Sequence, residues 1–372
     1  MARRDFYIDH LRTVMTALVV FAHAGMTYGS NGAWFYFEIP PSHSHTSIVL
    51  SAFTATMQAF PMGMFFLLAG YFTPRSFDRK GAWPFLLDRF IRLGIPLLAF
   101  GFILAPLTLA IRTTALRQGT RSMLIGLWRD REFINGPLWF AEGLLMMSIG
   151  YSLWRVFTRR RPNSQPPMPS PIPSNRAWLI AALSIALLML GIRQFIPADY
   201  RILGLWIASF PPFILFFIVG IAAQRRDWLT QLTWKQVRPW LITACIVWPL
   251  VPVALELTPN MADIPQFLSG FSWRSVLYAF WDPFVAWGAI SALLLWFSER
   301  HNYTTALWNW LDRRAYAVYV IHPPVIVAVC LLLRNWHAPP ASKFVIAGVL
   351  GNIAVWLASD PLVRLPGLKR IF

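Results

Sequence analysis

Ten runs of mostly apolar residues, each about long enough to cross a bilayer, follow one another along the chain. A spanning helix needs ~20 such residues, because ~30 Å of hydrocarbon is crossed at ~1.5 Å per residue. The runs cover residues 11–29, 47–72, 90–111, 136–157, 177–196, 202–223, 239–257, 274–298, 314–333 and 344–361. We therefore predict an all-α, polytopic integral membrane protein of about ten transmembrane helices, with residues 1–372 forming a single membrane domain.

Composition and charge exclude two other classes of protein. Only 13% of the residues are charged, about half of the ~25% typical of soluble proteins, and this excludes two ordinary soluble domains. The net charge of +17 suggests nucleic acid, but the basic residues cluster between apolar runs, as cytoplasmic loops do. We predict no nucleic-acid partner. The two cysteines, Cys245 and Cys330, lie inside apolar runs, so we expect neither a disulfide framework nor a metal site.

The distribution of basic residues predicts the topology. With a cytoplasmic N-terminus, 23 of the 33 lysines and arginines fall on the cytoplasmic side, and ten spans then place both termini there. The proline-rich segment 159–176 becomes a cytoplasmic linker that extends and buries nothing, between helices 1–4 in 1–158 and helices 5–10 in 177–372. The outer connection 112–135 carries five arginines, which indicates either a miscounted span or a basic surface with a function.

Four ionisable residues lie in or near the middle third of the predicted bilayer: His23, Glu142, Asp282 and His322. Such groups are costly in hydrocarbon, so each is a candidate for a shared functional site. Two of them also have a structural alternative. His322 precedes two prolines, and its ring can satisfy a backbone carbonyl. Asp282 precedes Pro283, and its carboxylate can pair with an arginine.

Arg89 and Arg92 form a different signal, three residues apart at the cytoplasmic mouth of a predicted helix. This spacing places both side chains on one face, where two guanidinium groups can hold phosphate through forked hydrogen bonds. The alternative is a pair of lipid anchors of the positive-inside kind.

Five segments resemble the membrane-bound acyltransferase-3 family. They are YIDHLRTVMTALVVFAHA (7–24), MFFLLAGYFTPRS (64–76), FLLDRFIRLGIP (85–96), GPLWFAEGLL (136–145) and AYAVYVIHPPV (315–325). The first is similar to the family's opening helix, in which a basic residue precedes a histidine by eleven positions, as Arg12 precedes His23. The ending VRLPGLKRIF resembles the branch that succinylates periplasmic glucans.

The resemblance implies a multi-pass protein of the bacterial inner membrane that moves an acetyl, succinyl or other short acyl group. The donor would be cytoplasmic acyl-CoA, with acetyl-CoA the commonest, and the acceptor a hydroxyl of an extracytoplasmic glycan or glycolipid. It implies no bound cofactor. By match to the family motifs, His23 would be catalytic, with Arg12 supporting it and Arg89 and Arg92 holding the donor.

The residues suit that chemistry. His23 can take the hydroxyl proton, and Glu142 can orient the imidazole or act as a base itself. Tyr316, Tyr319 or a helix N–H could stabilise the oxyanion, and the sequence does not select among them. His322, Tyr319 and Asp282 would support the site. The main alternative is a proton-coupled transporter in which His23 and Glu142 relay protons, and a weaker one is a membrane sensor or scaffold.

Overall fold

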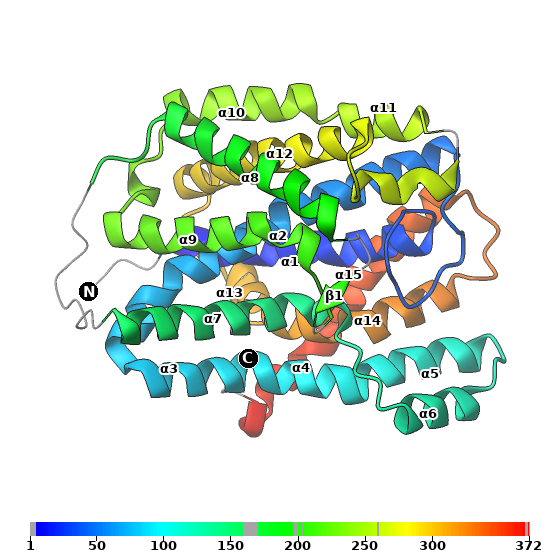
Figure 1. The fold of residues 1–372 in the computed structure, drawn as a ribbon. Coiled ribbons are helices and arrows are strands. Elements are labelled where there is room, and N and C mark those ends of the chain that lie inside the picture. The colour runs from blue at the N-terminus through cyan, green and yellow to red at the C-terminus, as the bar shows by residue number, and fades with distance from the viewer. Residues whose placement is uncertain are drawn as a thin grey trace. The chain divides into compact units, whose positions relative to one another are not determined.

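The structure is a computed structural model that describes residues 5–158, 170–196, 200–202, 204–258, 260–368 and 371. It is almost entirely helical (Figure 1). The longer helices are α1 (Phe6–Thr27), α2 (His45–Lys80), α7 (Trp139–Phe157), α8 (Asn175–Phe195), α9 (Pro211–Arg226), α10 (Trp234–Val247), α12 (Trp273–Arg300), α14 (Ala315–Leu332) and α15 (Pro340–Arg364). The shorter helices are α3 (Ala82–Arg89), α4 (Ile95–Ala99), α5 (Ala105–Ala115), α6 (Thr120–Arg129), α11 (Leu250–Glu256) and α13 (Ala306–Asp312).

Seven helices of the described residues are long and apolar enough to cross a membrane. They are His45–Lys80, Ala82–Ala115, Asn175–Phe195, Trp234–Glu256, Trp273–Arg300, Ala315–Leu332 and Pro340–Arg364. The other three predicted spans coincide with α1, α7 and α9, which are more polar or shorter: α1 carries Asp9 and Arg12, α7 carries Glu142 and Arg155, and α9 has 16 residues. The chain is an all-α, multi-pass membrane protein.

The predicted span 202–223 is wrong over residues 202–210. Strands β1 (Arg201–Ile202) and β2 (Leu205–Trp206) form an antiparallel pair there, and a 3₁₀ turn over Ile207–Ser209 follows. Helix α9 begins only at Pro211. Pro211 and Pro212 start this helix, since a proline in the first turn lacks only an N–H that has no helical partner anyway.

The structure also bears on two connections between the predicted spans. The linker ends at Ser174, whose side chain accepts a hydrogen bond from the Ala177 N–H and so caps α8. Its last residues are not free, because the Gln236 amide donates to the Pro173 carbonyl over 2.6 Å. Residues 159–169 lie outside the described part of the chain. In the basic connection 112–135, the ten-residue α6 is too short to be a missed span.

The chain divides into two compact units that alternate along the sequence. Unit 1 comprises Met1–Leu11, Ala55–Asp88 and Gly143–Tyr303, and unit 2 comprises Arg12–Thr54, Arg89–Glu142 and Thr304–Phe372.

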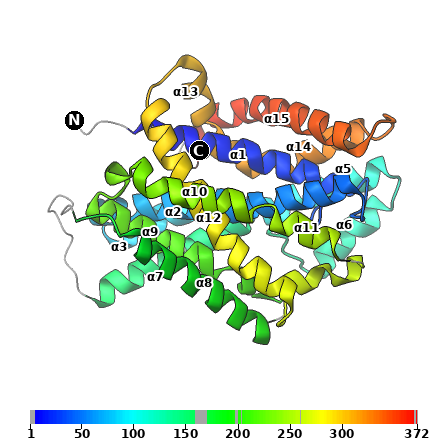
Figure 2. The same cartoon turned by 90° about the horizontal axis from the view of Figure 1, so that it is seen from above.

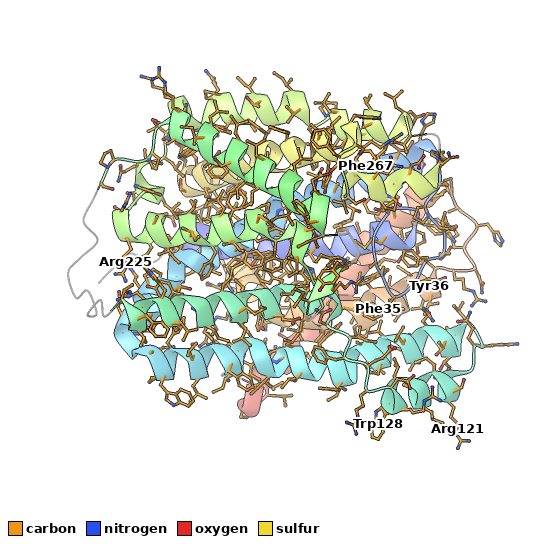
Figure 3. All side chains as sticks on the ribbon, viewed as in Figure 1. Phe35, Tyr36, Arg121, Trp128, Arg225 and Phe267 are labelled. Atoms are coloured by element: carbon orange, nitrogen blue, oxygen red, sulfur yellow. The ribbon has the colours of Figure 1, made fainter. Side chains whose placement is uncertain are left out.

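Unit 1 is built around α12, which packs along α10 and α8 (Figure 1). A glycine permits the close approach of α12 to α10: a Cβ at Gly288 would lie 2.4 Å from the carbonyl oxygen of Trp240. The ends of α2, α7 and α9 are joined by the Asp78 carboxylate, which lies 2.9 Å from Arg155 and 2.6 Å from Arg225 (labelled in Figure 3). This ion network fixes three helix ends at one point.

Unit 2 is built around α14, which packs against α15 and α5 (Figure 2). The part of α1 that belongs to this unit contacts α15, where the ring of Phe21 lies against Gly348. On α6, Arg121 and Trp128 point away from the ribbon (Figure 3), and Trp128 is 84% exposed. All the contacts of the candidate site described next lie inside unit 2.

Candidate active site

One face of α14 carries three polar side chains at intervals of three residues: Tyr316, Tyr319 and His322. The Tyr316 hydroxyl donates to the carbonyl oxygen of Arg92 over 2.5 Å, and the Tyr319 hydroxyl donates to the carbonyl oxygen of Pro137. His322 contacts His23 of α1. The motif Tyr-x-x-Tyr-x-x-His therefore connects α14 to three other segments of the unit.

The two histidines form a direct pair. His322 Nε2 lies 3.2 Å from His23 Nδ1, and the ring centroids are 4.8 Å apart. His322 is fully buried and His23 partly buried. Each ring is also held by a backbone carbonyl of its own helix: His322 Nδ1 lies 2.7 Å from Tyr319 O, and His23 Nδ1 lies 2.9 Å from Val19 O.

These contacts determine where the protons of the neutral rings are. A carbonyl oxygen only accepts hydrogen bonds, so Nδ1 of each ring must carry the hydrogen. His322 Nε2 then carries a lone pair and accepts a hydrogen bond from the Nδ1–H of His23. The same Nδ1–H is shared with the Val19 carbonyl oxygen. The remaining lone pair is on His23 Nε2. This is the nitrogen available to take a proton.

Trp34 stacks on both rings. Its ring centroid is 4.1 Å from that of His23 and 6.1 Å from that of His322, with interplanar angles of 27° and 8°. The indole Nε1–H is buried and has no hydrogen-bond partner among the described residues. Trp34 lies in the loop 28–44 between α1 and α2, where no periodic pattern or cluster of charges marks it in the sequence.

The loop 28–44 is anchored directly after Trp34. Lys343 of α15 forms a buried ion pair with Glu38, and the Arg112 guanidinium donates to the carbonyl oxygen of Phe35 over 3.0 Å. Burial and then the charge of Glu38 raise the pKa of Tyr36 to about 12. These anchors hold the indole in place against the histidines.

Glu142 has another partner. It lies in the first turn of α7, and its carboxylate accepts a 2.8 Å hydrogen bond from the side-chain amide of Asn135. The described contacts of the His23 ring are with Val19, His322 and Trp34. The side chain in hydrogen-bond contact with the His23 imidazole is therefore His322, and Glu142 contacts Asn135 instead.

The arginines predicted to hold the donor lie at a distortion of a long helix. The span Ala82–Ala115 contains two π-helical segments, Phe90–Gly94 and Phe100–Leu104. Arg89 immediately precedes the first of them and Arg92 lies within it. Arg92 is exposed and Arg89 and Arg12 are partly buried. π-helical turns occur frequently at functional sites, and here the Tyr316 hydroxyl satisfies a carbonyl of this one.

Asp282 lies elsewhere. It belongs to α12 of unit 1, where it interacts electrostatically with Arg193. The Arg193 guanidinium stacks 5.4 Å from the ring centroid of Tyr278 and donates to the Phe267 carbonyl. The charge of Arg193 near the Asp282 carboxylate favours the structural alternative for this residue. Of the four intramembrane candidates, the structure thus brings only His23 and His322 into contact.

A family model described as an acyltransferase domain matches residues 5–360, nearly the whole chain. No curated protein and no solved structure matches the chain.

Proposed function

This chain belongs to the acyltransferase-3 family and is an acyltransferase, and we propose that it moves a short acyl group, acetyl or succinyl, from acyl-CoA to a hydroxyl of an extracytoplasmic glycan or glycolipid. The observation that carries the proposal is the His23–His322 pair. An imidazole whose Nδ1–H is committed to two acceptors presents its other nitrogen as a base, which is what the attack of a hydroxyl on a thioester requires.

The reaction follows from this arrangement. The acceptor hydroxyl oxygen attacks the thioester carbonyl carbon while His23 Nε2 takes the hydroxyl proton, and the carbonyl electrons move onto oxygen. The oxyanion then collapses, the C–S bond breaks, and the CoA sulfur leaves with the proton that His23 held. The products are an ester and free CoA. His322 keeps the His23 ring in the reactive tautomer throughout.

Donor binding involves Arg12, Arg89 and Arg92 in this proposal, with the CoA phosphates held at the cytoplasmic side. Helix α14 connects that side to the histidines, since Tyr316 contacts the Arg92 carbonyl and His322 contacts His23. Tyr316 and His322 are six residues apart, or ~9 Å along the helix axis. The extended pantetheine arm of CoA is ~15–20 Å long, so it is long enough to cover this distance.

We also propose a location in the bacterial inner membrane with both termini cytoplasmic. The Asp78 network supports this topology, because it joins the ends of α2, α7 and α9, which the charge distribution assigns to the cytoplasmic side. Reporter fusions test it: fusions within 159–169 should report a cytoplasmic position, and a periplasmic signal there would contradict the topology.

The central experiment uses purified protein in detergent with acetyl-CoA and succinyl-CoA, with release of free CoA as the readout. Mass spectrometry of envelope glycans from cells with and without the gene identifies the acceptor. His23→Ala should fold and bind acyl-CoA yet lose 10²–10⁴ in rate, as expected for removal of a general base. Near wild-type transfer by a stable His23→Ala protein would refute the assignment, and substrate uptake without acyl-CoA consumption would favour a transporter.

A further inference from the structure

The transfer reaction places a negative charge on the thioester carbonyl oxygen, and that charge needs a hydrogen-bond donor. The sequence leaves Tyr316, Tyr319 and backbone N–H groups as possible donors. In the structure both hydroxyls are already committed: a tyrosine has one O–H hydrogen, Tyr316 donates it to Arg92 O and Tyr319 donates it to Pro137 O. Neither phenol is available to an oxyanion without breaking a contact that holds α14 in place.

Trp34 offers the donor that the tyrosines lack. An indole N–H can only donate, and a buried indole usually has an acceptor. The Nε1–H of Trp34 is buried and has none among the described residues, although the ring is stacked on the imidazole that would act as the base. A buried donor left without an acceptor beside a proposed base is a feature that substrate would satisfy.

The indole is also held in place before any substrate arrives. The Asn31 N–H donates to the Ser51 hydroxyl oxygen before Trp34, and the Arg112 contact to Phe35 O and the Glu38–Lys343 ion pair follow it, so the loop is fixed on both sides of Trp34. A donor that is fixed in advance needs no reorganisation as charge develops, and this is what makes such donors effective in a site shielded from water.

We propose that the Nε1–H of Trp34 donates a hydrogen bond to the thioester carbonyl oxygen and that this bond strengthens as the oxygen becomes an oxyanion. The inference rests on the proposed function. Atoms and electrons balance as before: His23 holds the hydroxyl proton, the oxyanion carries the electron pair, and the indole keeps its hydrogen. Trp34 thus adds a residue to the site that no family motif in the sequence includes.

The test separates the N–H from the ring. Trp34→Phe keeps an aromatic face against His23 but removes the donor, so it should lower kcat by roughly 10²–10³. A hydrogen bond that gains most of its strength in the transition state lowers kcat and kcat/KM by nearly the same factor, so KM for acetyl-CoA should stay within about twofold. Replacing Trp34 with benzothienylalanine, in which sulfur replaces the N–H, should give the same loss with the bicyclic ring intact. Trp128→Phe, on the exposed face of α6, is the matched control and should be unchanged.

The outcomes distinguish this inference from the proposed function. Wild-type rates for both Trp34 variants, alongside an inactive His23→Ala, would overturn the oxyanion role and leave the transferase standing. A loss in Trp34→Phe that benzothienylalanine restores would also overturn it, because the bicyclic ring and not the N–H would then matter. If the wild-type protein transfers no acyl group, the proposed function itself fails. Thermal unfolding of each variant identifies misfolding. If Trp34→Phe is misfolded, the kcat of the benzothienylalanine protein tests whether the N–H is required.

Discussion

His322 Nε2 lies 3.2 Å from His23 Nδ1, so two neutral imidazoles 299 residues apart in sequence form the central contact between α14 and α1. His322 is in turn fixed by the Tyr319 carbonyl. The arrangement resembles a catalytic dyad in which an imidazole, instead of a carboxylate, accepts from the base. His23 is thereby held in one tautomer by a partner that carries no charge.

This pairing predicts the effect of changing the partner. His322→Ala should lower kcat by roughly 10- to 100-fold, the range seen when hydrogen-bond partners that orient a functional imidazole are removed. His322→Gln should recover part of the rate, since the Gln amide oxygen can accept in place of Nε2. Steady-state kinetics with saturating acetyl-CoA provide the measurement. Equal rates for Ala and wild type would reduce His322 to a packing residue.

Glu142→Gln should lose less than about tenfold in kcat. The Gln side-chain oxygen can still accept from Asn135, and the described contacts assign the orientation of His23 to His322. Only the interaction of the negative charge with the N-terminus of α7 is lost, and this is worth under ~1 kcal/mol at an accessible site. Single-turnover assays on Glu142→Gln and His23→Ala side by side make the comparison. A loss as severe as that of His23→Ala would identify Glu142 as the base.

Arg89→Ala and Arg92→Ala should each raise KM for acetyl-CoA by roughly 10- to 100-fold, with a smaller effect on kcat. Loss of a charge-assisted contact to phosphate costs ~1.5–3 kcal/mol, which is that range of affinity. Titration calorimetry with CoA measures the affinity directly. Arg313→Ala is the control, because Arg313 is an exposed arginine of the same unit. Unchanged CoA affinity in both variants would contradict donor binding and favour the alternative, in which Arg89 and Arg92 are lipid anchors.

Lys343→Met should destabilise the protein and slow transfer together. It leaves the Glu38 carboxylate buried without its partner, and breaking a buried pair costs ~3–5 kcal/mol. The same pair anchors the loop that carries Trp34, so kcat should fall even in molecules that remain folded. Thermal unfolding in detergent and kinetics at a temperature well below the transition measure the two effects. The double variant Lys343→Met/Glu38→Leu should regain stability, and an additive loss would show that the pair is not coupled.

Much of the architecture follows from the sequence alone. Apolar runs of ~20 residues predict helices because hydropathy is a local sum, and each predicted span coincides with a helix for most of its length. The exception is 202–210, whose mixed composition does not distinguish a strand from a helix. This segment forms a strand pair, and the helix begins at Pro211. The family, and with it the acyltransferase activity, is also determined by local motifs whose order along the chain is sufficient evidence.

The partnerships within the site were decided by tertiary structure. The sequence placed His23, Glu142, Asp282 and His322 at similar depths, but depth along a helix does not specify the direction in which a side chain faces. The folded chain pairs His23 with His322, gives Glu142 to Asn135, and places Asp282 beside Arg193 in the other unit. Trp34 stacks on His23 because its loop is held by the ion pair between Glu38 and Lys343, which are 305 residues apart in sequence. No local sequence pattern encodes such a contact. Local patterns determine which segments enter the membrane, whereas the rotation and packing of those segments determine which polar groups meet.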